Sequence, residues 1–157
     1  MQRVLIIGFG SDLRGDDALG PRAATLLAQR PLGNHVRVLS CPSLTPEFAH
    51  DVAQADLVIF IDCDAKAEPG RITRRDVEAI DDAGAAMVHF LDPPALLGWA
   101  SLLYGAAPRA VMFTMGGATF ECADELSPSV AAAMPVLIER VAAEINGKPS
   151  DLEARHA

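Results

Sequence analysis

Three polar side chains lie where apolar segments of the chain end. Asp17 follows the apolar segment 4–8 and a glycine-rich loop. Asp62 closes the apolar segment 56–62, and His89 ends the sequence AMVH. Two carboxylates and one imidazole suit a borderline divalent ion such as nickel, zinc, cadmium or cobalt. Because three protein ligands leave coordination positions free for water or an incoming ligand, these residues predict an open metal site.

Two further carboxylates lie beside these candidates. Asp16 precedes Asp17, and Asp64 lies two residues beyond Asp62. Either one is able to orient a ligand or to act as a general base. Taken singly, each residue also has a structural interpretation. Asp16 and Asp17 suit a helix N-cap and first turn, Asp62 suits a cap of backbone amides, and His89 suits a hydrogen-bonded core histidine. The metal site therefore depends on their joint placement.

Strands and helices are expected to alternate along the chain. Apolar and alternating patterns predict strands over residues 3–8, 35–41, 56–62 and 109–115, with weaker signals over 70–74 and 86–90. Capping residues and prolines predict helices over residues 16–30, 45–54, 93–103 and 127–145, and residues 76–83 are expected to form an acidic surface loop. This order predicts a three-layer α/β sandwich with a mostly parallel, twisted sheet of about five strands and helices on both faces.

The predicted sheet explains how the three residues converge. All strands of a parallel sheet place their carboxyl ends at one edge, and α/β folds build their sites there. Asp17, Asp62 and His89 each follow a predicted strand and therefore belong to that edge. For His89 the inference requires that residues 86–90 form a parallel strand.

Length and composition limit the class of protein. The 157 residues, half of them hydrophobic, suit one domain over residues 1–146 followed by a polar tail over 147–157. A net charge of −8 disfavours binding to nucleic acid or anionic membranes. The sequence has no recognisable signal peptide and no apolar stretch near the roughly 20 residues that span a bilayer, so we expect a cytoplasmic protein. We also expect it to be a monomer. Three widely spaced cysteines without a CxxC motif indicate reduced thiols: Cys41, Cys63 and Cys122.

Four segments, in order along residues 3–141, resemble the NiFe-hydrogenase maturation proteases. That family's signature, GxGN-x-L-x-x-D-(D/E)-x-x-G, is similar to the opening GFGSDLRGDDALGPRAA. Its second block, an apolar strand ending in aspartate, is similar to LVIFIDCDAKAEPG. Its third block, a histidine followed by a helix, resembles HFLDPPALLGWASLLYG, and the segment before its last helix resembles FECADELSPSV.

The resemblance implies an aspartyl-type endopeptidase that removes the C-terminal extension of a hydrogenase large-subunit precursor. The family's metal-contacting acid, aspartate and histidine fall on Asp17, Asp62 and His89. Nickel already bound to the precursor is then the ion that is recognised, with zinc or cadmium substituting in vitro. The chain departs from the family pattern at Ser11, where Asn is usual, and at Phe90, where polar residues are common. It also has Asp17 where some relatives have glutamate.

Two other functions stay open. A non-catalytic nickel-binding checkpoint protein on the same fold would bind the precursor without cutting it. A small-molecule binding domain would use the loop 8–10, although Leu13 stands where a dinucleotide fingerprint has its third glycine. The chain has neither a GxSxG nor an HExxH motif. Cleavage would therefore use a metal-polarised carbonyl or a metal-activated water, with Asp16 or Asp64 as base.

Overall fold

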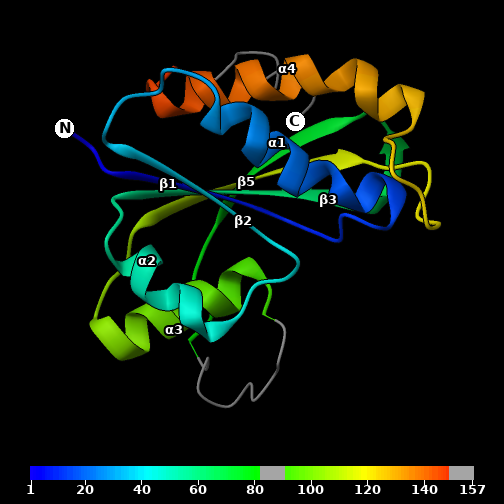
Figure 1. Ribbon diagram of the computed structural model, residues 1–157. Coiled ribbons are helices and arrows are strands. Elements are labelled where there is room, and N and C mark those ends of the chain that lie inside the picture. Colours follow the sequence, from blue (N-terminus) through cyan, green and yellow to red (C-terminus); the bar gives the residue numbers. More distant parts are fainter. Residues whose placement is uncertain (82–90, 149–157) are drawn as a thin grey trace.

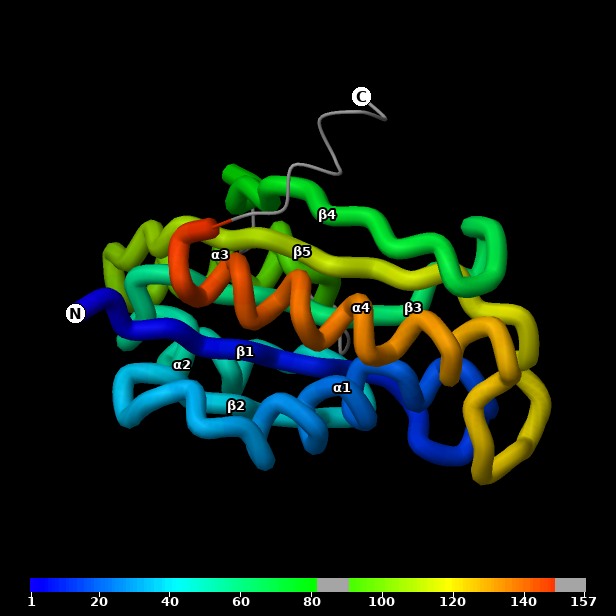
Figure 2. The backbone as a smooth tube through the Cα atoms, turned by 90° about the horizontal axis from the view of Figure 1, so that it is seen from above, coloured from blue at the N-terminus to red at the C-terminus, as the bar shows by residue number. Residues whose placement is uncertain are grey.

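The computed structural model describes residues 1–81 and 91–148, which form one α/β domain. A five-stranded sheet with the order β2-β1-β3-β5-β4 lies between two pairs of helices. Helices α1 and α4 cover one face, and α2 and α3 cover the other (Figure 1). Figure 2 shows α1 and α4 side by side over the sheet. The three-layer sandwich predicted from the sequence is confirmed.

Four strands run parallel, and the fifth closes one edge in the opposite direction. The parallel strands are β1 (Val4–Phe9), β2 (Val36–Cys41), β3 (Leu57–Pro69) and β5 (Arg109–Gly116). β4 (Ile72–Val77) pairs antiparallel with β5. The prediction that residues 76–83 form a loop is wrong at Asp76 and Val77, which belong to β4, because pairing with β5 overrides their local polar character. The predicted strand 86–90 and residues 149–157 of the predicted tail lie outside the described residues.

The last two helices begin close to their predicted starts, whereas the first two α-helices begin a few residues later than predicted. Short 3-10 turns precede the first two α-helices, and the bounds are η1 (Gly15–Ala18), α1 (Leu19–Ala28), η2 (Pro46–Phe48), α2 (Ala49–Ala53), α3 (Pro93–Tyr104) and α4 (Pro128–Ile145). Asp16 was expected to cap the first helix but lies inside η1, and no side chain caps the start of this turn. Asp92 does cap α3, because its carboxylate accepts a hydrogen bond from the Ala95 N–H at 2.9 Å. Among the residues that the structure describes, no helix combines the length and hydrophobicity needed to cross a membrane.

The apolar strands are buried on both faces. In β3, Ile59 and Ile61 pack in the cluster beneath α1 and α4, whereas Val58 and Phe60 pack in the cluster beneath α2 and α3. A central parallel strand covered by helices on both sides has no solvent face, which explains why it reads as a continuous apolar run. The prediction that this strand ends at residue 62 is wrong, because pairing with β5 carries β3 beyond Asp62 and on to Pro69.

Helix α1 begins in direct contact with the ends of β1 and β3. A Cβ added at Gly8 would lie 2.0 Å from the Gly20 carbonyl oxygen, and a Cβ at Gly20 would lie 2.6 Å from the Ile61 carbonyl oxygen. Glycine is therefore required on both sides of this helix–strand contact. The contact brings the loop before α1, residues 10–17, over the ends of the two strands.

Candidate active site

Asp17 and Asp62 lie beside the carboxyl end of β1. Asp17 is in the turn η1 that follows this strand, and Asp62 lies within β3, just beyond the last residue that pairs with β1. β1 and β3 pair in register up to Gly8 and Ile61, and Asp62 is the next residue of β3. Asp62 Oδ1 accepts a hydrogen bond from the Cys63 N–H at 2.8 Å, and Asp17 Oδ2 accepts one from the Ser11 N–H at 2.8 Å. Both side chains are partly buried. The structure therefore brings these two predicted site residues to the same edge.

The environment of Asp62 makes its negative charge unfavourable. The pKa of its carboxyl group is raised from 3.8 to about 7, chiefly by burial and also by the charges of Asp17 and Asp64, against the opposing hydrogen bond from the Cys63 N–H. A carboxylate with like charges beside it is stabilised by a cation or a proton. Asp62 is therefore suited to accept a proton near neutral pH or to bind a positive ion.

Asp16 has a different environment from its neighbour. Its side chain is 0 % exposed and accepts four hydrogen bonds from the segment after β5, residues 117–127. The donors are the backbone N–H groups of Ala118, Thr119 and Ser127 and the Ser127 hydroxyl, at 2.7 to 3.0 Å. Burial opposes ionisation, but these hydrogen bonds outweigh it and lower the pKa of Asp16. Asp16 thus joins two loops as a buried, hydrogen-bonded carboxylate.

Ser127 and Gly117 also belong to the contact between the loop of Asp16 and the segment 117–127. The sequence analysis did not predict this role for either residue. Ser127 was predicted only to start the last helix, and Gly117 lies just beyond the predicted strand 109–115. A Cβ at Gly117 would lie 2.5 Å from Cys63 Sγ and 3.1 Å from the Asp16 Cβ. The sequence signal at hand was the Gly116-Gly117 pair, which marks a close backbone approach without naming the partner.

The Cys63 thiol is not activated for chemistry. Burial, together with the charges of Asp62, Asp16, Asp17 and Asp64, raises its pKa to about 12. A thiol with a raised pKa stays protonated at neutral pH and is a poor nucleophile. The four carboxylates that act on it show how much negative charge this edge of the sheet collects.

The third predicted ligand, His89, lies outside the described residues. Leu91, two residues later, forms an antiparallel bridge with Leu44, which follows the carboxyl end of β2. The described part of the chain holds no group of three His, Cys, Asp or Glu side chains arranged to bind a metal ion. Metal binding therefore stays a prediction that requires a ligand beyond Asp17 and Asp62.

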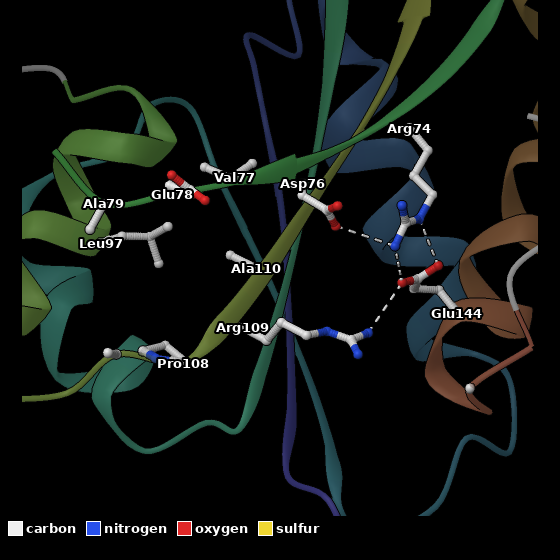
Figure 3. A pocket seen from close by; sticks show the side chains of 12 residues that line it. Arg74, Asp76, Val77, Glu78, Ala79, Leu97, Pro108, Arg109, Ala110 and Glu144 are labelled. Atoms are coloured by element: carbon white, nitrogen blue, oxygen red, sulfur yellow. Dashed lines mark hydrogen bonds and ion pairs between the residues drawn. The ribbon is translucent and has the colours of Figure 1, made fainter. Parts of the chain in front are cut away.

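A second polar cluster lies toward the opposite end of the strands, where β5 begins. Arg74 from β4 forms a two-pronged ion pair with Glu144 from α4, at 2.7 and 2.9 Å, and Arg109 approaches Glu144 at 3.4 Å (Figure 3). Glu144 is only 2 % exposed. These residues border a pocket of about 780 Å³ at the start of β5, far from the carboxyl ends of the strands. The cluster ties the antiparallel edge strand to the last helix.

Breaking this ion pair is expected to lower the stability of the protein without touching the carboxylate site. We expect Glu144→Gln to reduce the free energy of unfolding by about 2 kcal/mol, because the charge-assisted hydrogen bonds from Arg74 to the buried Glu144 carboxylate would be weakened, while the contact of Arg74 with Asp76 at 3.5 Å remains. Urea unfolding followed by circular dichroism measures this loss. Glu139→Gln, at an exposed position of the same helix, is the control and should change the stability by less than about 0.5 kcal/mol. Equal stability of both variants would contradict a structural role for the cluster.

A sequence model of the hydrogenase maturation proteases matches residues 21–144, so the chain belongs to that family. Its members are endopeptidases, and the protein is a hydrolase of this class. A comparison with curated proteins finds no significant match.

Solved structures of the same class agree with this assignment. The NiFe hydrogenase maturation protease HycI from Thermococcus kodakarensis is 25% identical, with 92% of each chain covered and a TM-score of 0.72. The hydrogenase 2 maturation peptidase from a Thaumarchaeota archaeon is 28% identical over 93% of this chain and 99% of its own, with a TM-score of 0.71. The maturating endopeptidase HybD from Escherichia coli is 26% identical over 92% and 93% of the two chains, also with a TM-score of 0.71.

Proposed function

We propose that this protease removes the C-terminal extension of a NiFe-hydrogenase large-subunit precursor and recognises the nickel of that precursor through Asp17, Asp62 and His89. The observation that carries the proposal is the pair Asp17 and Asp62. Asp17, in the turn after β1, lies close to Asp62 on the neighbouring strand β3, and burial together with the nearby charges raises the pKa of Asp62 to about 7. A divalent ion placed beside them would relieve their repulsion.

The nickel belongs to the substrate in this proposal. Two carboxylates and one histidine leave coordination positions for ligands from the precursor, so the ion would bind well only when the precursor supplies them. The selectivity for a nickel-loaded precursor follows from this shared coordination. Zinc or cadmium would take the same oxygen and nitrogen ligands in vitro.

The described carboxylates divide between two roles in the proposed cleavage. Asp16 uses both oxygens to accept four hydrogen bonds, which leaves it poorly suited to take a proton from water. Asp64 is partly buried beside Asp62 and accepts one hydrogen bond, from the Lys66 N–H at 2.9 Å. Asp64 is therefore the better candidate for a base that assists a metal-bound water or carbonyl.

The loop 8–10 offers little support for a nucleotide-binding function. A Cβ at Gly8 would meet the Gly20 carbonyl, and a Cβ at Gly10 would lie 2.0 Å from the Asp17 carbonyl oxygen. Both glycines thus serve contacts within the protein. A phosphate site would instead need glycines whose open side faces the ligand.

Cleavage of a precursor tests the proposal directly. The purified protein is mixed with a nickel-loaded large-subunit precursor and, separately, with the nickel-free form, and the loss of the extension is followed by mass spectrometry. We expect cleavage of the nickel-loaded form alone. Binding of that form without cleavage would favour a checkpoint protein, and equal cleavage of both forms would contradict recognition of nickel.

A further inference from the structure

Leu13 combines a fixed backbone with an exposed side chain. Its side chain is 66 % exposed, yet its carbonyl oxygen accepts a hydrogen bond from the Ala123 N–H at 3.3 Å. The next residue, Arg14, forms a parallel bridge with Ala123, and the Gly15 N–H donates to the Ala123 carbonyl at 3.3 Å. The two loops that meet here lie side by side at one end of the molecule (Figure 2). A large apolar side chain is thus held in solvent on an ordered support.

This support is part of the carboxylate site. The loop that carries Leu13 is fixed by the Ser11 N–H, which donates to Asp17 Oδ2 at 2.8 Å. On its other side the Asp16 N–H donates to the Thr119 carbonyl at 2.8 Å, and the Asp16 carboxylate accepts four hydrogen bonds from the same segment. Leu13 therefore lies four residues before Asp17 on a loop that the site itself holds in place.

The side chain gains nothing from exposure in the free protein. Apolar area that is buried on binding favours the complex, and a backbone already fixed lowers the entropy that binding must otherwise remove. Its surroundings are polar, since Asp12 and Arg14 on the same loop and Glu121 on the facing segment are exposed. Single exposed leucines are common on protein surfaces, so the observation that points to a contact with the substrate is the place of Leu13 on the loop that Asp16 and Asp17 hold.

We propose that Leu13 is a substrate-docking residue, which contacts an apolar side chain of the precursor polypeptide as that polypeptide lies over Asp17 and Asp62. The inference rests on the proposed function and names the contact through which the precursor is held. Leu13 touches no reacting atom in this role. It is expected to affect the binding of the precursor and to leave the rate of the bound complex nearly unchanged.

Steady-state cleavage of the nickel-loaded precursor tests the role of Leu13. We expect Leu13→Ala to raise KM roughly tenfold or more, because about three buried carbon atoms are lost, with kcat within about twofold. Leu13→Met keeps the apolar volume and should stay within about threefold of wild type in KM. The matched control is Leu102→Ala on α3, at 61 % exposure, near the opposite edge of the sheet. Thermal unfolding of all variants should be unchanged, since both side chains lie in solvent.

The outcomes separate the inference from the proposed function. Suppose that the wild-type protein cuts the precursor. If Leu13→Ala then leaves KM unchanged, or if Leu102→Ala raises KM equally, the inference about Leu13 is wrong and the proposed function stands. A fall in kcat at constant KM also overturns the inference about Leu13. If the wild type binds without cutting, the same comparison is made with the dissociation constant of the precursor. A wild type that neither binds nor cuts overturns both proposals.

Discussion

Asp62→Asn is expected to abolish precursor cleavage and at the same time to stabilise the protein at pH 8. The substitution keeps the shape of the side chain and an oxygen that accepts the hydrogen bond from the Cys63 N–H. It removes the charge that the proposed function assigns to the precursor's nickel. Because even outer-shell partners of a metal site contribute 10- to 100-fold, we expect the loss of a direct ligand to exceed about 100-fold in kcat/KM.

The gain in stability follows from the pKa of Asp62. The folded protein holds this pKa at about 7, above the usual value of 3.8, so folding is disfavoured once the carboxyl group must ionise. The wild type therefore loses stability as the pH rises from about 4 through about 7, whereas the asparagine variant lacks this loss. One pKa unit corresponds to about 1.4 kcal/mol, and after a discount for partial solvent access we expect a gain of about 2 kcal/mol at pH 8 and none at pH 4.

Urea unfolding at pH 4 and pH 8 measures this effect. Asp12→Asn, an exposed aspartate on the loop before Asp17, is the matched control and should show no pH-dependent gain. If Asp62→Asn and the wild type are equally stable at pH 8, the environment of Asp62 does not disfavour its charge. If the variant still cleaves the precursor at the wild-type rate, Asp62 has no part in recognising nickel.

Asp16→Asn is expected to cause the largest loss of stability, about 4 kcal/mol at pH 7. The carboxylate accepts four hydrogen bonds in a fully buried position. Asparagine has one acceptor oxygen, and its amide N–H₂ would face donors that then have no acceptor. A hydrogen bond to a charged group contributes about 1.5 to 3 kcal/mol, and each buried donor left unpaired adds a further cost.

The pH dependence of Asp16 has the opposite sign to that of Asp62. Its pKa is lowered in the folded protein, so its contribution is present above the usual value of 3.8 and is lost as the pH falls through the folded value. The stability difference between wild type and Asp16→Asn should therefore narrow under acid conditions. Unfolding curves at pH 7 and pH 3.5 test this, with Ser127→Ala as a milder comparison that removes only the hydroxyl donor and costs about 1 kcal/mol. A difference that widens in acid would contradict the assignment.

The same variant separates structure from catalysis at Asp16. Measured at a low temperature at which Asp16→Asn stays folded, cleavage of the precursor should persist, because Asp16 is proposed to hold two loops together. If the fully folded variant does not cleave the precursor, Asp16 takes part in catalysis, and the general base is Asp16. Asp64→Asn, by contrast, is expected to lose cleavage while remaining as stable as the wild type.

Local patterns were sufficient to predict most helices and strands and the proximity of two acids, Asp17 and Asp62. The apolar runs around Ile6, Ile59 and Val111 predict buried strands, since a strand covered on both faces must be apolar throughout. Prolines and cap residues place the starts of α3 and α4 correctly. The proximity of Asp17 and Asp62 followed from the sequence because one acid comes after β1 and the other lies on the neighbouring parallel strand, although β3 continues beyond Asp62.

What only the tertiary structure decided depends on contacts between residues far apart in the chain. Asp16 and Asp17 are adjacent and chemically identical, yet hydrogen bonds from residues more than 100 positions away make Asp16 a buried link between loops. The raised pKa of Asp62 likewise results chiefly from burial, and also from the charge of Asp17, which another segment brings near it, and of Asp64 on the same strand. β4 joins the sheet antiparallel through its pairing with β5. The sequence by itself determined the elements and the edge at which acids gather, because these follow from local periodicity. Packing decided the role of each acid, because burial and long-range hydrogen bonds are set only when distant segments meet.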